Sequence, residues 1–199
     1  FFRIWEIPSD AVHGLLGQFQ PSLGMSRDEI EAYGLHWQEA LFTEPFITDW
    51  VLDRVFKEHA EEVREKYLVP GTDGRYKMHP DYDTQKKVEK AFEGKTSDKD
   101  IWIRDGLYAL ISDVLFVRDH KDASKFHPRI SVQFDFIYES LYDSDKQIFN
   151  QLYNDYFYRR NNHFWYREAM RKLPQLVNAT RMLVCAEDLG MVPDCVPWV

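Results

Sequence analysis

Apolar residues recur every three or four positions through the middle of the chain. Between residues 46 and 56 they predict an amphipathic helix that begins at the N-cap Thr43 and reaches about Ala60. A second stripe, from 107 to 115, predicts an amphipathic helix over about 98–118. The residues that follow, 119–129, are polar and predict a loop. The central part of the chain is therefore expected to be mostly helical.

Capping signals predict further helices in the same part of the chain. Ser26 and Glu29 have capping-box spacing and predict a short helix to about Tyr33. Residues 83–93 are polar and predict an exposed helix that ends at a glycine. A second capping box at 144–147 begins a helical segment that runs to about Leu173, with Pro174 in the first turn of the next short helix.

Short continuous apolar runs lie at the two ends of the chain. Residues 1–7 read as a strand that Pro8 stops, and residues 181–186 read as a strand followed by a turn at Gly190. A long helical block between two short strands is typical of an enlarged connection between a strand and a helix. We therefore divide the chain into a strand with its loop (1–25), a mostly helical insertion (26–178), and a second strand with its turn (179–199).

Charge and composition exclude several classes of protein. The net charge is −8, whereas a nucleic-acid-binding surface is usually basic, so no nucleic-acid partner is expected. No stretch has the length of a membrane span, and we expect no membrane partner. The only cysteines are Cys185 and Cys195, and the sequence has no metal-ligand spacing, which predicts a cytoplasmic protein without metal or cofactor.

One basic and aromatic run leaves two readings open. It can grip phosphates, or it can form a solvated helix face, and the second reading is the more ordinary one for a helix of this composition. Its members are Arg159, Arg160, His163, Trp165 and Arg167.

The hexapeptide 185–190 is the strongest local signal for chemistry. An apolar strand there ends in two carboxylates, Glu187 and Asp188, before the chain turns at Gly190. In parallel β/α barrels, catalytic residues lie at this end of a strand. A carboxyl that is half-buried beside another carboxylate can have a raised pKa, as a general acid requires. The alternative is a helix N-cap or a solvated turn, which the hexapeptide alone does not exclude.

A second motif, Arg3-x-Trp5-Glu6-Ile7-Pro8, stands near the start of the chain. By itself it reads as a strand with a buried tryptophan. Together with the Ala-Glu-Asp-Leu-Gly motif at 186–190, it resembles the 4-α-glucanotransferases, the amylomaltases and disproportionating enzymes of the α-amylase clan. The resemblance implies an α/β fold: part of a (β/α)8 TIM-type barrel that contains a large, mostly α-helical insertion.

The stretch between the two motifs is similar to one subgroup of that family. Compact amylomaltases join the motifs by a few tens of residues, whereas the plant cytosolic disproportionating enzymes and their bacterial relatives carry a long insertion here. Several shorter segments also resemble that subgroup, in the same order: 19–22, 118–119, 126–129, 158–160 and 173–180.

The resemblance implies roles for individual residues. Glu187 falls on the family's acid/base glutamate. The nucleophilic aspartate is expected four positions before Phe1, and a third aspartate beyond Val199, so the chain alone is expected to be inactive. Arg3, Trp5 and Glu6 are candidates for binding the donor sugar, although Trp5 fits a purely structural place equally well. Asp188 either tunes Glu187 electrostatically or caps the turn.

The implied activity is transfer of α-1,4-linked glucosyl units from maltose or a maltodextrin to a glucan acceptor, by a retaining double displacement. The expected partner is therefore an α-glucan or malto-oligosaccharide. Two alternatives stay open: an α-glucan hydrolase of the same clan, and a non-catalytic helical interaction module. The aromatic run within 153–166 fits a sugar platform or a helix-packing face.

Overall fold

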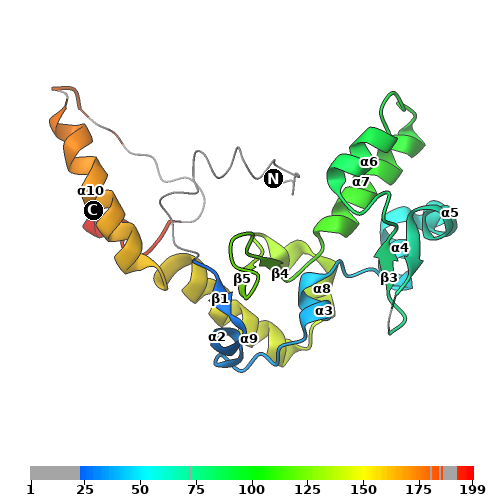
Figure 1. Ribbon diagram of the computed structural model, residues 1–199, viewed down its shortest axis with the longest axis horizontal. Coiled ribbons are helices and arrows are strands. Elements are labelled where there is room, and N and C mark those ends of the chain that lie inside the picture. The colour runs from blue at the N-terminus through cyan, green and yellow to red at the C-terminus, as the bar shows by residue number, and fades with distance from the viewer. Residues whose placement is uncertain (1–22, 72, 180, 184, 186–191) are drawn as a thin grey trace. The chain divides into compact units, whose positions relative to one another are not determined.

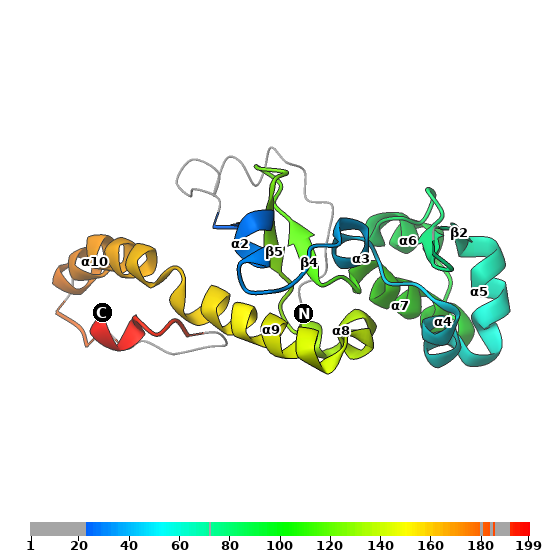
Figure 2. The same cartoon turned by 90° about the horizontal axis from the view of Figure 1, so that it is seen from below.

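The structure, a computed structural model, describes residues 23–71, 73–179, 181–183, 185 and 192–199 (Figure 1). These residues form two compact units. The first comprises the described parts of 1–26 and 37–141, and the second comprises those of 27–36 and 142–199. Helices and short strands are mixed along the chain (Figure 2).

The main core of the first unit is helical. It is built from α4 (Asp49–Phe56), α5 (Ala60–Tyr67), α6 (Gln85–Ala91) and α7 (Asp98–Ser112), with the 3-10 turn η1 (Lys57–His59) between α4 and α5. The apolar faces of these helices meet, and the largest side chains among them are fully buried. They include Val51, Leu52, Phe56, Val63, Val88, Ile103, Leu107 and Leu110.

The predicted N-cap at Thr43 is wrong. Thr43 is the last residue of the short helix α3 (Glu39–Thr43), and its hydroxyl donates to the Glu39 carbonyl at 2.8 Å. Helix α4 begins instead after Thr48, whose hydroxyl accepts a hydrogen bond from the Val51 N–H at 3.3 Å. The proline at 45 explains the shift, because it keeps Glu44 extended and so separates the two helices.

The helix predicted over 98–118 begins as expected but is shorter. Ser97 caps α7 by accepting from the Asp100 N–H at 3.1 Å, and the helix ends at Ser112. The next residues form strand β4 (Phe116–Arg118), and the predicted loop contains β5 (Lys125–Pro128). Pairing between the two strands, which no helical periodicity reveals, competes with extension of the helix.

Two small antiparallel sheets complete the first unit. Strand β5 lies between β1 (Met25–Ser26) and β4, and β2 (Leu68–Pro70) pairs with β3 (Tyr76–Met78). Neither of these sheets closes into a barrel within the described residues. The short helices η2 (Val132–Phe134) and α8 (Phe136–Ser140) follow β5.

An aromatic cluster packs beneath the three-stranded sheet. Trp37 lies at its centre, with ring centroids 5.6 Å from Phe42, 5.5 Å from Phe116 and 4.4 Å from Phe126. All four rings are buried. Because Phe116 is on β4 and Phe126 is on β5, this cluster anchors the β4–β5 hairpin to α3.

The second unit consists of α2 (Arg27–Glu31), α9 (Asp143–Asn154), the π-helical turn η3 (Asp155–Arg159), α10 (Asn162–Asn178) and the 3-10 turn η4 (Val196–Trp198). The short helix after Ser26 is therefore confirmed. The long helical segment is confirmed in extent, but η3 interrupts it. Pro174 lies inside α10 rather than at the start of a new helix. This part of α10 is exposed, so water can solvate the backbone carbonyl that the proline leaves without a donor.

The run predicted as a strand at 181–186 is described only in part. Residues 181–183 and 185 form no strand, and Met182 and Leu183 are 78% and 90% exposed. A strand forms when a neighbouring strand satisfies its backbone N–H and C=O groups, and neither sheet of the described residues pairs with this run. The domain boundaries 1–25, 26–178 and 179–199 stay a prediction.

Candidate functional site

The residues with predicted catalytic or substrate-binding roles lie outside the described residues. These are Arg3, Trp5, Glu6, Glu187 and Asp188. The predicted strands at 1–7 and 181–186 fall there, the first in whole and the second in part. Their roles therefore stay predictions, and the geometry below concerns the segments between the two motifs.

The structure brings two of the family-like segments, 118–119 and 126–129, into one hairpin. Strands β4 and β5 pair antiparallel, with Arg118 opposite Phe126 and Val117 opposite His127. The guanidinium of Arg118 lies 5.0 Å from the centroid of the Phe126 ring, donates to the Ala123 carbonyl at 2.7 Å, and pairs with Glu39. The resemblance in these segments thus corresponds to a single local structure.

Asp119 and His127 form a close pair in this hairpin. The Nε2 atom of His127 lies 2.8 Å from the Asp119 carboxylate, whose side chain is almost fully buried. The other carboxylate oxygen accepts from the backbone N–H groups of Lys121 and Asp122, at 2.7 and 3.0 Å. An ionised carboxylate only accepts, so the imidazole donates through Nε2. The Asp119 carboxylate therefore orients the His127 imidazole, and its two backbone hydrogen bonds fix the loop between the strands.

Gly24 is required where the chain passes this pair. A Cβ atom there would lie 2.8 Å from the Lys125 Cβ and 3.3 Å from the His127 Nε2 atom. Only a residue without a side chain allows the segment before β1 to approach β5 this closely. The glycine in the sequence indicated that the backbone turns or approaches another segment closely here. The sequence did not predict that this segment is β5.

A buried carboxyl, Asp113, and a partly buried carboxyl, Asp135, lie near the start of α8. Asp113 accepts from the backbone N–H groups of Phe136 at 3.1 Å and Ile137 at 2.9 Å. Burial raises the pKa of Asp113 to about 7, although these two hydrogen bonds oppose the rise. Burial also raises the pKa of Asp135 to about 6, against the lowering effect of its ion pair with Arg129. The first carboxyl holds the start of α8, so its role is structural.

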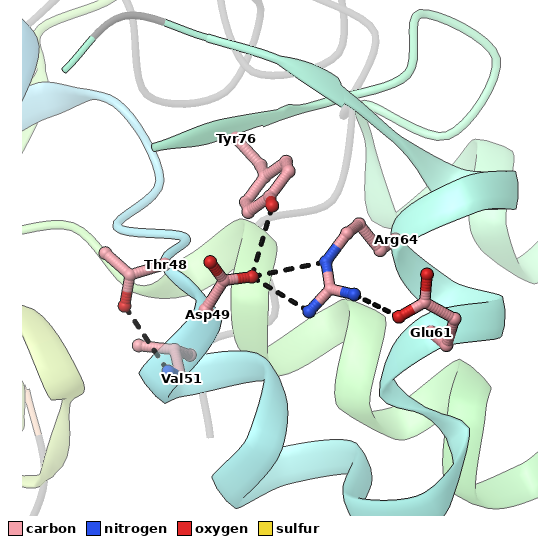
Figure 3. Close-up of polar contacts among 6 residues, drawn as sticks. All are labelled: Thr48, Asp49, Val51, Glu61, Arg64 and Tyr76. Atoms are coloured by element: carbon pink, nitrogen blue, oxygen red, sulfur yellow. Dashed lines mark hydrogen bonds and ion pairs between the residues drawn. The ribbon is translucent and has the colours of Figure 1, made fainter. Parts of the chain in front are cut away.

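A third polar group joins α4, α5 and β3 at the surface (Figure 3). One carboxylate oxygen of Asp49 accepts from the Arg64 guanidinium at 2.8 and 3.2 Å and from the Tyr76 hydroxyl at 3.1 Å. Glu61 pairs with the same guanidinium. The acceptor is already shared among three donor groups of the protein, which indicates a tie between elements rather than a ligand site.

In the second unit, the family-like segment 158–160 is held by ion pairs. Arg159 pairs with Asp155 at 2.9 Å and with Asp194 at 3.3 Å, and Arg160 pairs with Glu29 at 2.7 Å. These two members of the basic and aromatic run are therefore engaged within the protein. Because both guanidinium groups are already paired within the protein, they do not support the interpretation of this run as a phosphate-binding surface.

The aromatic run within 153–166 divides into two parts. Tyr153 and Phe157 pack with ring centroids 4.6 Å apart, and Tyr156 lies 4.9 Å from Phe157, as in a packing face. Trp165 and Tyr166 on α10 are each 38% exposed. The packing-face reading therefore holds for the first part, and the second part leaves both readings open.

Comparison with known proteins identifies the family. The family model described as 4-alpha-glucanotransferase matches residues 1–199, so the chain belongs to the 4-alpha-glucanotransferase family. The chain is also similar to a curated protein of Oryza sativa subsp. japonica, 4-alpha-glucanotransferase DPE2, at 34% identity over 202 aligned positions. The alignment covers 98% of this chain and 21% of that protein, so the chain spans about a fifth of its relative's length. No solved structure matches the chain.

No group of three or more histidine, cysteine or acidic side chains in the described ranges has the geometry to hold a metal ion. No helix in the described part of the chain is both long and apolar enough to cross a membrane.

Proposed function

We propose that the protein to which this chain contributes transfers α-1,4-linked glucosyl units, and that Glu187 is its acid/base residue. The observation that carries the proposal is the family match over residues 1–199, which includes the Ala-Glu-Asp-Leu-Gly motif at 186–190. The printed name of the rice relative is that of a 4-alpha-glucanotransferase. Because the chain spans a fifth of that relative, the activity is assigned to the longer protein.

The proposed reaction has two displacements at one anomeric carbon. A carboxylate nucleophile outside this chain attacks that carbon and forms a covalent glucosyl ester, while Glu187 gives its proton to the departing glycosidic oxygen. An acceptor hydroxyl then attacks the same carbon and releases the nucleophile. Glu187 takes the hydroxyl proton, so it acts first as acid and then as base. Two inversions give net retention, which requires the two carboxyl groups to lie about 5–5.5 Å apart.

The proposed donor is maltose or a maltodextrin, and the proposed acceptor is a larger glucan. Arg3, Trp5 and Glu6 would then lie near the donor sugar, and Asp188 would cap the turn after Glu187. No metal or cofactor has a part in this chemistry, because a carboxylate pair supplies both the nucleophile and the proton. These assignments rest on the position of each residue in the motifs.

The proposed architecture of the longer protein is a (β/α)8 barrel whose strands include the runs at 1–7 and 181–186. Helix α10 supports this placement, since it directly precedes the second run and the described residues bury none of its side chains. A barrel helix buries such an apolar face against the sheet. The self-contained helical core of α4 to α7 fits an insertion between barrel elements. A cytoplasmic location agrees with Cys185 and Cys195, which are both free.

The test is Glu187→Gln in the longer protein, with maltotriose as substrate. Loss of general acid/base catalysis is expected to lower kcat by about 10²–10⁴-fold. Asp188→Asn is the control, and a much smaller loss is expected. Unchanged turnover in Glu187→Gln would refute the assignment and favour the interaction module. Products of the parent protein decide the other alternative: longer maltodextrins indicate transfer, whereas glucose and maltose alone indicate hydrolysis.

A further inference from the structure

An open groove of about 580 Å³ runs along α6 and α7 on the first unit. The two helices lie side by side (Figure 1), and the turn after α6 completes the wall. Its volume is within the range of about 300–1,000 Å³ that small-molecule sites occupy. None of its described lining residues is one to which the family resemblance assigns catalysis or sugar binding.

Charged side chains of both signs line this groove. Lys86, Glu89 and Lys90 share one face of α6, and Glu93 continues their spacing in the turn after the helix; these four residues are called the helical row. Lys95 and Arg104 add two further cations from the turn and from α7. All four members of the helical row are exposed.

The four charges of the helical row form no ion pair within 4.0 Å in the described part of the chain. The neighbouring Lys87, by contrast, pairs with Asp83 at 2.6 Å and donates to the Pro80 carbonyl at 2.8 Å. The groove therefore offers free ammonium donors and free carboxylate acceptors side by side. A complementary ligand must supply acceptors and donors at close spacing.

Rings form the apolar part of the groove. Tyr108 is partly exposed and has the Arg104 guanidinium 6.0 Å from its ring centroid, and the Lys95 ammonium lies 4.6 Å from that of Phe92. Arg104 is itself held by Asp105 at 2.8 Å. The lining of the groove thus combines aromatic rings with charged side chains of both signs.

We propose that this groove is a surface binding site for an α-glucan chain, formed by residues other than those assigned to catalysis. Vicinal hydroxyl groups of a sugar donate to a carboxylate and accept from an ammonium, which matches the row from Lys86 to Glu93. The C–H face of a glucosyl ring packs against the exposed part of Tyr108. The choice of α-glucan rests on the proposed function.

An anionic ligand fits the groove less well. Glu89 and Glu93 stand on the same face as the lysines and would repel it. A neutral polyol can donate hydrogen bonds to the carboxylates and accept them from the ammonium groups, and it has no charge that either would repel. The test below therefore includes an anionic competitor.

The experiment is affinity electrophoresis of the 199-residue chain through gels that contain soluble glycogen. We expect glycogen to retard the chain, and free maltoheptaose to relieve the retardation. Lys90→Ala/Glu93→Ala is expected to raise the apparent Kd at least about fivefold, because it removes one donor and one acceptor. Lys172→Ala/Glu65→Ala is the matched control: it removes the same charges at exposed positions outside the groove and should leave the Kd unchanged.

Three results would overturn the site: no retardation by glycogen, equal retardation of the groove and control variants, or release by inorganic tripolyphosphate in place of maltoheptaose. Both variants change only exposed residues, so folding is expected to survive, and a circular dichroism melt checks this. The readout needs no turnover, so it does not depend on the role assigned to Glu187. If the chain does not bind glycogen through the groove, the catalytic assignment of Glu187 is unaffected. If Glu187→Gln keeps full turnover, the result of the binding experiment is unaffected.

Discussion

Helices α7 and α10 have similar lengths but different environments. Helix α7 has 15 residues and buries five of them, Ile103, Gly106, Leu107, Leu110 and Ile111. Helix α10 has 17 residues and buries none, so Met170, Leu173, Leu176 and Val177 are 41–56% exposed. Both sequences carry apolar residues at helical spacing, which shows that periodicity predicts a helix but does not reveal what covers its apolar residues.

The largest expected effect contrasts one leucine from each helix. Leu107→Ala in α7 leaves a cavity in a fully buried site and should lower the free energy of unfolding of the chain by about 2–5 kcal/mol. Leu173→Ala in α10 removes a side chain that is 43% exposed and should change it by no more than about 0.5 kcal/mol. Urea unfolding measures both. Equal losses would contradict the contrast between the helices.

A second prediction concerns the close approach of α7 to α4. A Cβ atom at Gly106 would lie 2.3 Å from the Cε1 atom of Phe56. Gly106→Ala should therefore destabilise the chain by about 1–3 kcal/mol, although alanine is the better helix former. Thermal denaturation is the measurement. The double variant Gly106→Ala/Phe56→Leu should lose less stability than the two single variants lose together. Strict additivity of the losses would show that the two sites do not touch.

The first unit should also depend on pH through Asp113. Its pKa is raised to about 7 in the folded state, whereas the unfolded value is near 4, so the folded state binds more protons between these values. Stability from this group is therefore complete at low pH and is lost as pH rises, by about 1 kcal/mol per pH unit between about 4.5 and 6.5. Urea titrations across this range measure the slope.

The matched variant for that slope is Asp113→Asn. The amide turns an N–H donor toward one of the two backbone N–H groups that the carboxylate accepts, so an overall loss of about 1–3 kcal/mol is expected at neutral pH. The free energy of unfolding of this variant should change less steeply with pH than that of the parent chain. An unchanged slope would show that another carboxyl is responsible.

The smallest expected effect belongs to the second unit. Tyr33 on the segment after α2 donates to the Asp155 carboxylate at 3.2 Å, and its own pKa is raised by partial burial and by that carboxylate. Tyr33→Phe should lower the free energy of unfolding by about 0.5–1.5 kcal/mol. Tyr142→Phe is the control, because Tyr142 is 81% exposed. Equal effects of both variants would mean that the hydrogen bond contributes nothing measurable.

Local signals in the sequence predicted most of the helices. The capping residue Ser97 and the stripe that follows it located α7, and the polar stretch before Gly94 located α6. Strands β4 and β5 were missed because each has three or four residues and depends on the other, with Arg118 opposite Phe126. The π-helical turn η3 has no signal in the periodicity.

The residues of the candidate site were predicted less completely than the helices. The motifs at 3–8 and 186–190 indicated the family, which the comparison confirmed, but the residues themselves lie outside the described structure. The Asp119–His127 pair was contained in two family-like segments, and only the hairpin brings its members together. The α6–α7 groove was not predictable, since an exposed row of mixed charge usually indicates only a solvated helix face.

Azide rescue tests the central claim about Glu187 most directly. In the longer protein, Glu187→Ala with α-maltosyl fluoride as donor needs no proton for the first displacement, because fluoride departs unaided. The base is still missing in the second displacement, and azide needs none. The account predicts that azide accelerates turnover and yields α-maltosyl azide with retained configuration. Turnover that azide does not change, or maltotriose transfer at the parent rate, would contradict it.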